Sequence, residues 1–430
     1  MKNDRVRYLV VGNSTAAIGA VEAIRRLDPS GTIRLLSREP HHVYSRPLIP
    51  MLLEPDVDLH RLDLRPRDFY EAHGVDKHLG LAAERLDPRD RTVWTREGPV
   101  PFETLLLACG GKPFRPAEVG GLDACGVFSF TGWDDAVNIR SALETSKVSQ
   151  AVVVGGGLIG IKAAEALRAR GIEVTLVELA DRVLPLALDA RGSRMAAAAI
   201  RKAGVELLCG TTATCIEAPG GRASAVRLRN GACLPCGLVV MAIGVAPNAD
   251  LAAGTDIRVD RGIVVDDRCE TSVKGIYAAG DVAQGTDALT GASRPIPIFP
   301  NAFWQGTTAG TCMAGGEPRP AAAFAMNAVE VFGLPTISVG LATASGEGTE
   351  VLTAEDEAGT SYKRIVLRGN RVVGALFVGD VDRAGIYTGL IRDRVDVGTV
   401  KPLLTTDEFG LLRLPQQYRK HLVLGEGIEA

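Results

Sequence analysis

The chain has 430 residues, of which 46% are hydrophobic and 23% charged, and its formal net charge at pH 7 is −3. This length predicts two or three domains with large cores. The charge excludes the basic footprint of a nucleic-acid-binding protein, and no apolar stretch is long enough to cross a bilayer, so we expect neither nucleic acid nor membrane insertion.

The chain opens with a strand, a glycine turn and a helix. Val6–Val11 is apolar and predicts a buried strand, and a helix is expected from about Thr15 to Leu27. The turn between them reads Gly12-Asn13-Ser14-Thr15-Ala16-Ala17, in which Ser14 and Ala17 stand where such turns usually carry glycine. Because N–H groups at a helix N-terminus attract phosphate, this βαβ start predicts a dinucleotide site. Glu39 ends the following segment and is the expected acceptor for an adenosine ribose, with Arg38 beside it.

The N-terminus runs directly into that first strand, which predicts no signal peptide and a cytoplasmic location. Eight cysteines are scattered without a disulfide framework, at positions 109, 125, 209, 215, 233, 236, 269 and 312. Cys233 and Cys236 form the single CxxC, which we interpret as two thiols flanking a strand start. Neither the cysteines nor the six histidines show metal-ligand spacing, so no metal is expected.

A second and sharper βαβ start follows about 140 residues later. The strand Ala151–Val154 leads into a turn that keeps all three glycines of the dinucleotide pattern. We expect a pyrophosphate to contact Gly155, Gly157, Leu158, Ile159 and Gly160. Glu178 closes the next strand, where a carboxylate accepts hydrogen bonds from a ribose and repels a 2′-phosphate, so NADH is expected over NADPH. Arg182, four residues farther on, carries a positive charge that argues against this expectation.

Two such turns in one chain predict a flavin and a nicotinamide held together, an arrangement that moves electrons between them. Beyond about residue 318 the pattern changes. Strands at Lys363–Leu367 and Val372–Val378, around a turn at Gly369-Asn370, predict an antiparallel sheet with helices.

Three later elements carry a resemblance to a known family. They are Ile276-Tyr277-Ala278-Ala279-Gly280-Asp281, Ala108-Cys109-Gly110-Gly111 and Gly244-Val245-Ala246-Pro247-Asn248. With the two turns, they resemble the pyridine nucleotide–disulfide oxidoreductase superfamily over at least residues 5–315. The resemblance implies an α/β fold with two Rossmann-like domains, the FAD domain being interrupted by the NAD domain, and a C-terminal α+β interface domain. The expected bounds are 1–116 and 249–317 for FAD, 117–248 for NAD, and 318–430 for the interface domain.

The resemblance also implies roles for individual residues. Asp281 is expected to hydrogen-bond the ribityl chain of FAD, and Arg46 to contact its phosphate, with Met51 where related reductases carry a lysine. Lys162 stands where many relatives have a glutamate facing the nicotinamide, and Phe299 where ferredoxin reductases have a tryptophan beside the flavin; these two are the expected catalytic residues. The remaining cofactor contacts are expected at Gly12, Ser14, Thr15, Ala16, Ala17, Ala83, Ala108, Cys109, Gly110, Gly244, Gly280 and Pro300.

The first 108 residues contain no cysteine. Disulfide reductases and NADH peroxidases place a redox cysteine against the flavin in this region, so here electrons must leave the flavin directly. The run Tyr44-Ser45-Arg46-Pro47-Leu48 is similar to that of rubredoxin and ferredoxin reductases and of the NADH-binding part of nitrite reductases. It is also similar to that of FAD/NAD subunits of phenylglyoxylate dehydrogenase and tungsten aldehyde oxidoreductase.

The predicted function is electron transfer between NAD(H) and an iron–sulfur partner, as the flavin subunit of a multi-subunit dehydrogenase for aldehydes or 2-oxoacids. Hydride transfer between nicotinamide and flavin requires orientation and no acid–base pair. Three alternatives stay open: a stand-alone NADH:rubredoxin or ferredoxin reductase, an NADH oxidase, and a non-enzymatic redox-gated binding protein. A homodimer or a hetero-oligomeric complex is expected, with the tail Pro415–Ala430 reaching a partner.

Overall fold

The computed structural model describes residues 5–318 and 323–414, which form two compact units. Unit 1 comprises residues 1–118, 128–147 and 243–324, and unit 2 comprises residues 119–127, 148–242 and 325–430. The tail Pro415–Ala430 lies outside the described residues, and the domain bounds given above remain predictions.

Unit 1 is built on a seven-stranded sheet of order β3-β2-β1-β6-β5-β4, in which β18 also pairs with β6. The central strands are parallel, while β4 and β5 are antiparallel additions at one edge. The strands are β1 (Val6–Val11), β2 (Ile33–Ser37), β3 (Val75–Leu79), β4 (Arg85–Asp87), β5 (Thr92–Thr95), β6 (Gly98–Leu107) and β18 (Ile276–Ala278). Parallel strands are buried on both faces, which explains the continuous apolar runs of β1 and β18.

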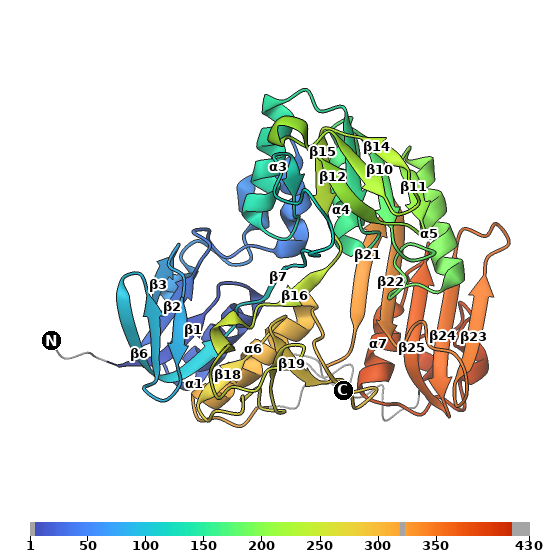
Figure 1. The fold of residues 1–430 in the computed structure, drawn as a ribbon. Helices are drawn as coiled ribbons and strands as arrows, with labels where there is room; N and C mark the ends of the chain where they lie inside the picture. Colours follow the sequence, from blue (N-terminus) through green and yellow to red (C-terminus); the bar gives the residue numbers. More distant parts are fainter. Residues whose placement is uncertain (1–4, 319–322, 415–430) are drawn as a thin grey trace. The chain divides into compact units, whose positions relative to one another are not determined.

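Two helices, α1 (Thr15–Leu27) and α6 (Phe299–Met313), lie beside each other and share one apolar cluster with the sheet (Figure 1). Their backbones come into close approach because three glycines line the crossing. A Cβ at Gly19 would lie 2.6 Å from the Phe303 carbonyl oxygen, and one at Gly306 would lie less than 3.0 Å from that of Ala16. A Cβ at Gly310 would meet Ala20 in the same way. The helix that follows the first glycine turn is therefore fixed directly to α6.

The rest of unit 1 consists of short elements. A three-stranded sheet has the order β17-β19-β20, and β7 pairs with β16 in an antiparallel ladder. These strands are β7 (Gly111–Pro113), β16 (Val245–Pro247), β17 (Ile263–Val264), β19 (Ala283–Thr286) and β20 (Ser293–Arg294). The helical segments are η1 (Arg46–Leu53), η2 (Leu59–Leu62), α2 (Phe69–Ala72), α3 (Trp133–Thr145) and η4 (Asp250–Ala252).

Unit 2 contains a second sheet, of order β11-β10-β9-β15-β8, whose β9, β10, β11 and β15 are parallel. Between β11 and β15 the chain forms a three-stranded antiparallel sheet of order β12-β13-β14. The strands are β8 (Val127–Phe128), β9 (Gln150–Val154), β10 (Glu173–Glu178), β11 (Glu206–Cys209), β12 (Ala213–Glu217), β13 (Ala225–Leu228), β14 (Cys233–Pro235) and β15 (Leu238–Met241). The helices are α4 (Leu158–Ala169), α5 (Ala190–Lys202) and the short η3 (Pro219–Gly221).

The C-terminal part of unit 2 is an antiparallel sheet of order β21-β22-β25-β24-β23. Its strands are β21 (Met326–Val331), β22 (Leu334–Gly340), β23 (Glu350–Glu355), β24 (Tyr362–Arg368) and β25 (Arg371–Val378), and α7 (Ala384–Arg392), η5 (Lys401–Leu403) and η6 (Leu411–Arg413) follow. Side chains join this sheet to α5: Tyr362 donates to the helix-capping Asp189 at 2.7 Å, and Arg191 pairs with Glu355 at 2.8 Å. Glu350, at the other end of β23, pairs with Lys401.

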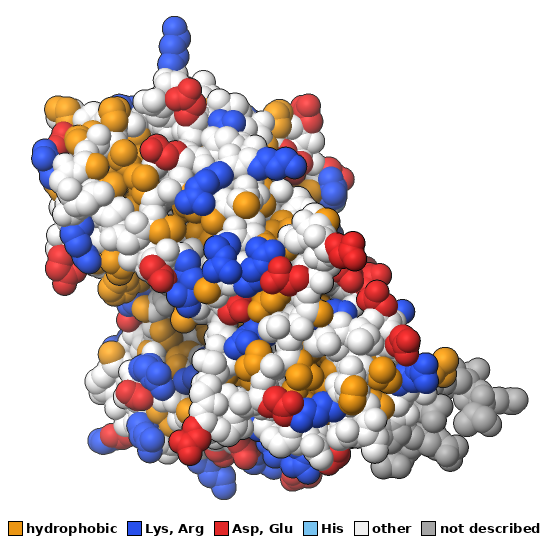
Figure 2. All heavy atoms as spheres, turned by 90° about the vertical axis from the view of Figure 1, so that its right-hand side faces the viewer, with side chains coloured by type: hydrophobic (Ala, Val, Ile, Leu, Met, Phe, Trp, Pro, Cys, Tyr) orange, Lys and Arg blue, Asp and Glu red, His pale blue; other side chains and the backbone are white. Residues whose placement is uncertain are grey.

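Two βαβ starts and a separate C-terminal sheet confirm the predicted fold class. No helix within the described ranges combines the length and the apolar character needed to cross a membrane. On the face drawn in Figure 2, acidic, basic and apolar side chains are interspersed.

Candidate functional site

The first glycine turn packs tightly against neighbouring strands of unit 1. The Gly12 N–H donates to the Leu36 carbonyl at 2.8 Å, and its φ of 122° is one that favours glycine. A Cβ at Gly12 would lie less than 3.0 Å from the Ala108 carbonyl oxygen. Ser14 caps no N–H of α1 with its side chain, so the first-turn amides are available to a phosphate. Thr15, Ala16 and Ala17, the first residues of α1, are buried.

A second element of the same unit presents an acidic side chain. Gly280 follows β18 with a φ of 80°, and its N–H donates to the Gln305 side-chain oxygen at 2.9 Å. A Cβ at Gly280 would be 3.3 Å from the Ala16 Cβ and 3.5 Å from the Ala302 Cβ. The turn that carries Asp281 is thus held between α1 and α6.

The environment of the Asp281 carboxylate tests whether this site fits FAD. Burial raises its pKa, and the nearby Arg46 guanidinium opposes that rise without cancelling it. It accepts no hydrogen bond from any residue that the structure describes. The Asp281 side chain is only partly buried, so its carboxylate is accessible to the donors of a ligand, and a chain of hydroxyl groups can supply them. The ribityl chain of FAD has that chemistry, so the residues fit the cofactor.

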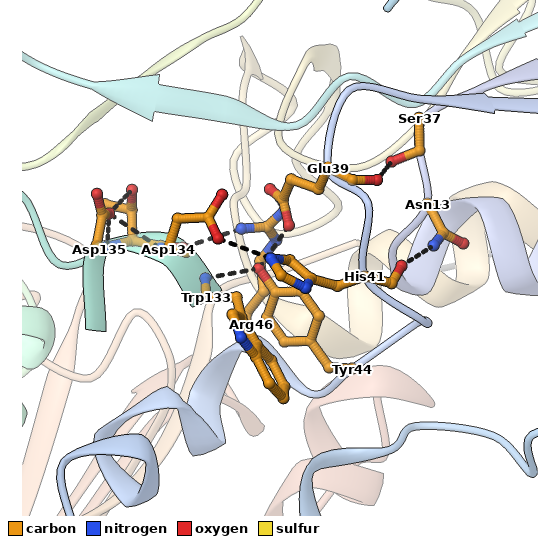
Figure 3. A network of polar contacts seen from close by, with 11 residues as sticks. Asn13, Ser37, Glu39, His41, Tyr44, Arg46, Trp133, Asp134 and Asp135 are labelled. Atoms are coloured by element: carbon orange, nitrogen blue, oxygen red, sulfur yellow. Dashed lines mark hydrogen bonds and ion pairs between the residues drawn. The ribbon is translucent and has the colours of Figure 1, made fainter. Parts of the chain in front are cut away.

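A compact polar network surrounds Glu39 (Figure 3). Arg46 Nη2 lies 2.6 Å from Glu39 Oε1, and the Tyr44 hydroxyl donates to Oε2 at 2.7 Å. The Trp133 N–H donates to the same hydroxyl at 3.0 Å, and Arg46 Nη1 donates to the Thr131 carbonyl at 3.0 Å. Burial opposes ionisation of Glu39, but the charge and the hydrogen bonds of Arg46 hold its pKa below the usual range.

The network continues through His41 toward the glycine turn. His41 Nε2 lies 2.7 Å from Asp134 Oδ1, and the His41 ring stacks on Trp133 with centroids 5.0 Å apart (Figure 3). The His41 carbonyl accepts from Asn13 Nδ2 at 3.2 Å. Residues of the first turn, of the loop after β2 and of the start of α3 are therefore joined by side-chain contacts.

Cys109 stands beside the first turn and is not poised for redox chemistry. Its Sγ lies 4.0 Å from the Val11 carbonyl oxygen, and burial raises its pKa to about 12. The thiol is therefore protonated at neutral pH. Gly110, the next residue, has a φ of 66°.

The remaining predicted flavin residues also lie in unit 1. Phe299 and Pro300 are the first two residues of α6, and Phe299 is 38% exposed. Ala83 is partly buried and packs, like Cys109, on the cluster at the second face of the sheet. Gly244, predicted on the nicotinamide side, also belongs to unit 1, where its φ is 112° and its carbonyl accepts from the Phe114 N–H.

The second glycine turn, in unit 2, has the features of an open phosphate cradle. Gly155 has a φ of 114° and donates to the Val177 carbonyl at 2.7 Å. A Cβ at Gly157 would meet nothing within 4 Å, whereas one at Gly160 would lie less than 3.0 Å from the Gly155 carbonyl oxygen. Leu158 and Ile159 begin α4 directly after the cradle. Space at the second glycine and close packing at the third are what a bound pyrophosphate requires.

Glu178 is the last residue of β10, and its carboxylate folds back on this turn. Oε2 accepts from the Gly156 N–H at 2.6 Å, and Oε1 accepts from the Ala180 N–H at 2.7 Å. Arg182 does not bind it: Arg182 Nη1 pairs with Asp181 at 2.9 Å, while its buried Nε has no partner among the described residues. The structure therefore brings Glu178 to the cradle and leaves Arg182 outside this contact.

Lys162, predicted to act on the nicotinamide, is engaged elsewhere in unit 2. Its Nζ lies 2.6 Å from Glu165 Oε2 and donates to the Glu330 carbonyl at 2.6 Å. Glu165 Oε1 in turn accepts from the Phe332 N–H at 2.5 Å. The pair thus fastens α4 to the β21–β22 hairpin, and a role for Lys162 at the nicotinamide remains a prediction.

The sequence did not predict two side chains that hold parts of the candidate site in place. Gln305 holds the Gly280 amide, and Tyr44 bridges Glu39 to the start of α3. Neither shows a local signal of its role. A signal for the helix crossing was present in the spacing Gly306-x-x-x-Gly310, since small residues four apart allow helices to approach closely.

Comparison with known proteins identifies the family. Residues 6–306 match the family described as pyridine nucleotide-disulphide oxidoreductase, and residues 326–395 match the rubredoxin NAD+ reductase C-terminal domain. The chain is 34% identical to the NADH-dependent phenylglyoxylate dehydrogenase subunit epsilon of Aromatoleum evansii, over 92% of this chain and 93% of that protein. It is 30% identical to the nitrite reductase [NAD(P)H] of Bacillus subtilis, over 91% of this chain and only 48% of that longer protein.

Among solved structures, the covalent putidaredoxin reductase–putidaredoxin complex is similar, with a TM-score of 0.83 and 26% identity over 91% of this chain and 94% of that chain. The predicted family, its FAD and NAD(H) cofactors and the predicted enzyme class are confirmed by these matches. The chain belongs to the pyridine nucleotide-disulphide oxidoreductase family and is an FAD-dependent oxidoreductase acting on NAD(P)H.

Proposed function

We propose that the chain is the flavin subunit of a multi-subunit dehydrogenase and exchanges electrons between NAD(H) and an iron–sulfur partner. The observation that carries this proposal is the match to a dehydrogenase subunit over nearly the full length of both chains. Phenylglyoxylate is a 2-oxoacid, so a 2-oxoacid or aldehyde is the proposed substrate class of the whole complex.

The chemistry that bound FAD supplies is hydride exchange with the nicotinamide and single-electron exchange with an iron–sulfur centre. The protein contributes binding and orientation. In unit 1 the α1 amides and Arg46 are proposed to bind phosphate, and Asp281 the ribityl hydroxyls. In unit 2 the Gly157 cradle and Glu178 are proposed to bind the pyrophosphate and adenosine ribose of NAD(H).

The state of the thiols supports direct electron exit from the flavin. Burial raises the pKa of Cys109 to about 12 and that of Cys236 and Cys312 to about 11, and it also raises the pKa of Cys209 and Cys269. Reactive cysteines need a lowered pKa, so these five are poor relays. Together with the absence of cysteine before position 109, this favours electron transfer without a sulfur intermediate.

A stand-alone reductase is the second candidate. It is favoured by the C-terminal match to the rubredoxin NAD+ reductase C-terminal domain and by the likeness to putidaredoxin reductase in its covalent complex with putidaredoxin. Both candidates need a docking iron–sulfur protein, and they differ in whether that protein stays bound. A cytoplasmic location and a homo- or hetero-oligomeric state are parts of the proposal.

Purification of the chain alone, with assays of NADH oxidation, separates the candidates. A complex subunit is expected to reduce artificial dyes rapidly and to show little activity with rubredoxin or ferredoxin. Affinity purification from its native cells should then recover a cluster-containing protein in fixed ratio. A monomer that turns over rapidly with rubredoxin or ferredoxin would instead establish the stand-alone reductase, and a colourless protein that refuses reconstitution would refute both.

A further inference from the structure

We infer that Glu39 is a positioning residue that holds the Arg46 guanidinium for the FAD phosphate and does not bind the adenosine ribose itself. The inference deepens the proposed function and rests on its phosphate-binding role for Arg46. It assigns to Glu39 a role different from the one that its sequence position suggests.

The first argument is that both carboxylate oxygens of Glu39 are directed to the network in Figure 3. Oε1 accepts from Arg46 and Oε2 from Tyr44, at 2.6 and 2.7 Å. Arg46 is held at a second point by the Thr131 carbonyl, yet its side chain is still 41% exposed. An arginine has five N–H donors in a planar group, so two anchored nitrogens fix its plane and leave donors for a phosphate.

The second argument comes from the two βαβ starts of the chain. Gly12 donates to the Leu36 carbonyl and Gly155 to the Val177 carbonyl, which aligns the two turns. The residue that corresponds to Glu178 is therefore Ser37, and Glu39 lies two residues farther on. Glu178 binds the backbone of its own glycine turn, whereas Glu39 binds the loop after β2. The two acids thus occupy different places.

The third argument concerns charge. A carboxylate near a phosphate repels it, so by charge alone the removal of Glu39 would tighten FAD binding. Pre-organisation works in the opposite direction, because a fixed guanidinium loses less entropy when the phosphate binds. The sign of the effect on FAD affinity therefore discriminates between a positioning role and a merely nearby charge.

A double-mutant cycle on the full chain tests the inference, with FAD binding to the apoprotein followed by flavin fluorescence. Glu39→Gln should raise the Kd for FAD about tenfold, equivalent to about 1.4 kcal/mol. In an Arg46→Met background the same change should raise the Kd less than twofold, because there is no guanidinium left to position. A full tenfold loss in that background would overturn the inference in favour of direct ribose binding, and a tighter complex in the single variant would also overturn it.

The matched control is Glu22→Gln. Glu22 pairs with Arg65 at 2.6 Å and is 26% exposed, against 25% for Glu39, so the change removes an equivalent ion pair of the same unit. Its FAD affinity should match wild type. If Glu39→Gln does not fold, Tyr44→Phe removes the bond to Oε2 and the acceptor of the Trp133 N–H but keeps the Arg46 ion pair. It should weaken FAD binding two- to threefold, and again only when Arg46 is present. Wild-type protein that binds no FAD would refute the proposed function, whereas additive losses would refute only the positioning role.

Discussion

Gly306 and Ala16 approach so closely that a Cβ added to the glycine would lie less than 3.0 Å from the backbone of the alanine. The helix that starts at the first glycine turn and the helix that starts at Phe299 are thus held by direct backbone contact. Any side chain at this point must push the two helices apart.

We therefore expect Gly306→Ala to lower the free energy of unfolding by about 3 kcal/mol, at the upper end of overpacking costs, and to reduce bound flavin. Urea unfolding and the flavin-to-protein absorbance ratio measure both effects. Gly385→Ala is the control, since Gly385 lies in α7 and a Cβ there would meet nothing within 4 Å. That change should leave stability equal or raise it slightly, because alanine favours helices. Equal behaviour of the two variants would show that the helices can separate at no cost.

Coenzyme choice should depend on Glu178. Glu178→Ala removes the carboxylate that accepts from Gly156 and Ala180, and with it the expected partner of the ribose. We expect kcat/KM for NADH to fall about tenfold or more, as for a lost hydrogen bond to a charged group, and the NADH-to-NADPH ratio to fall. Glu173→Ala, at the start of the same strand, should change neither. A wild-type KM lower for NADPH than for NADH would contradict this assignment.

The stability of the FAD-free protein should depend on the charge of Asp281. Burial raises the pKa of this carboxyl from its usual value of 3.8, so the folded state favours the protonated form. The contribution of this carboxyl to the free energy of unfolding is therefore complete below pH 3.8, and it is lost as the pH rises through the raised folded-state pKa. Asp281→Asn should remove this decline, giving an apoprotein with a higher Tm than wild type at pH 7 and weaker FAD binding. Melting curves from pH 4 to pH 8 test this; an Asn variant that is less stable at pH 7 would refute it.

Thiol reagents should leave turnover intact. Cys109 has a pKa of about 12, so it reacts slowly with maleimide, while the exposed Cys125 and Cys233 are accessible for labelling. Mass spectrometry should find labelled protein with unchanged NADH oxidation, and Cys109→Ser should keep its activity. Inactivation that runs in parallel with the labelling of one cysteine would indicate a sulfur relay.

Lys162→Met should loosen the C-terminal hairpin. The change breaks the contacts of Nζ with Glu165 and the Glu330 carbonyl, so amide exchange over β21 should accelerate and Tm should fall. Lys202→Met, on the exposed end of α5, is the control. If the rate of flavin reduction by NADH drops strongly while exchange stays unchanged, Lys162 acts at the nicotinamide as its sequence position suggests.

Local sequence patterns predicted those strands, helices and turns whose conformation depends on neighbouring residues in the chain. Val6–Val11 and Thr15–Leu27 were expected as strand and helix and occur with those bounds. The glycines at positions 12 and 155 were recognisable because their backbone conformations, with φ of 122° and 114°, exclude most other residues.

The partners of charged side chains were not predictable in this way. Lys162 meets Glu330, 168 residues away in sequence, and Arg46 meets Thr131 across 85 residues. Such pairs depend on how distant segments pack, and no periodicity in the sequence encodes them. The conformation of the loop after β2 was not predictable for a different reason. Its η1 segment is a 3₁₀ helix with Pro50 inside it, and such a segment has no α-helical repeat to detect.

The acidic ends of β23 restrict how copies of the chain can assemble. If two such strands paired antiparallel about their centres, Glu350 of each would stand opposite Glu355 of the other, and like charges in direct cross-strand register are unfavourable. Arg191 and Lys401 would offset this only by giving up the geometry of their present pairs. Continuous sheet formation by two β23 strands paired in this register is thereby discouraged.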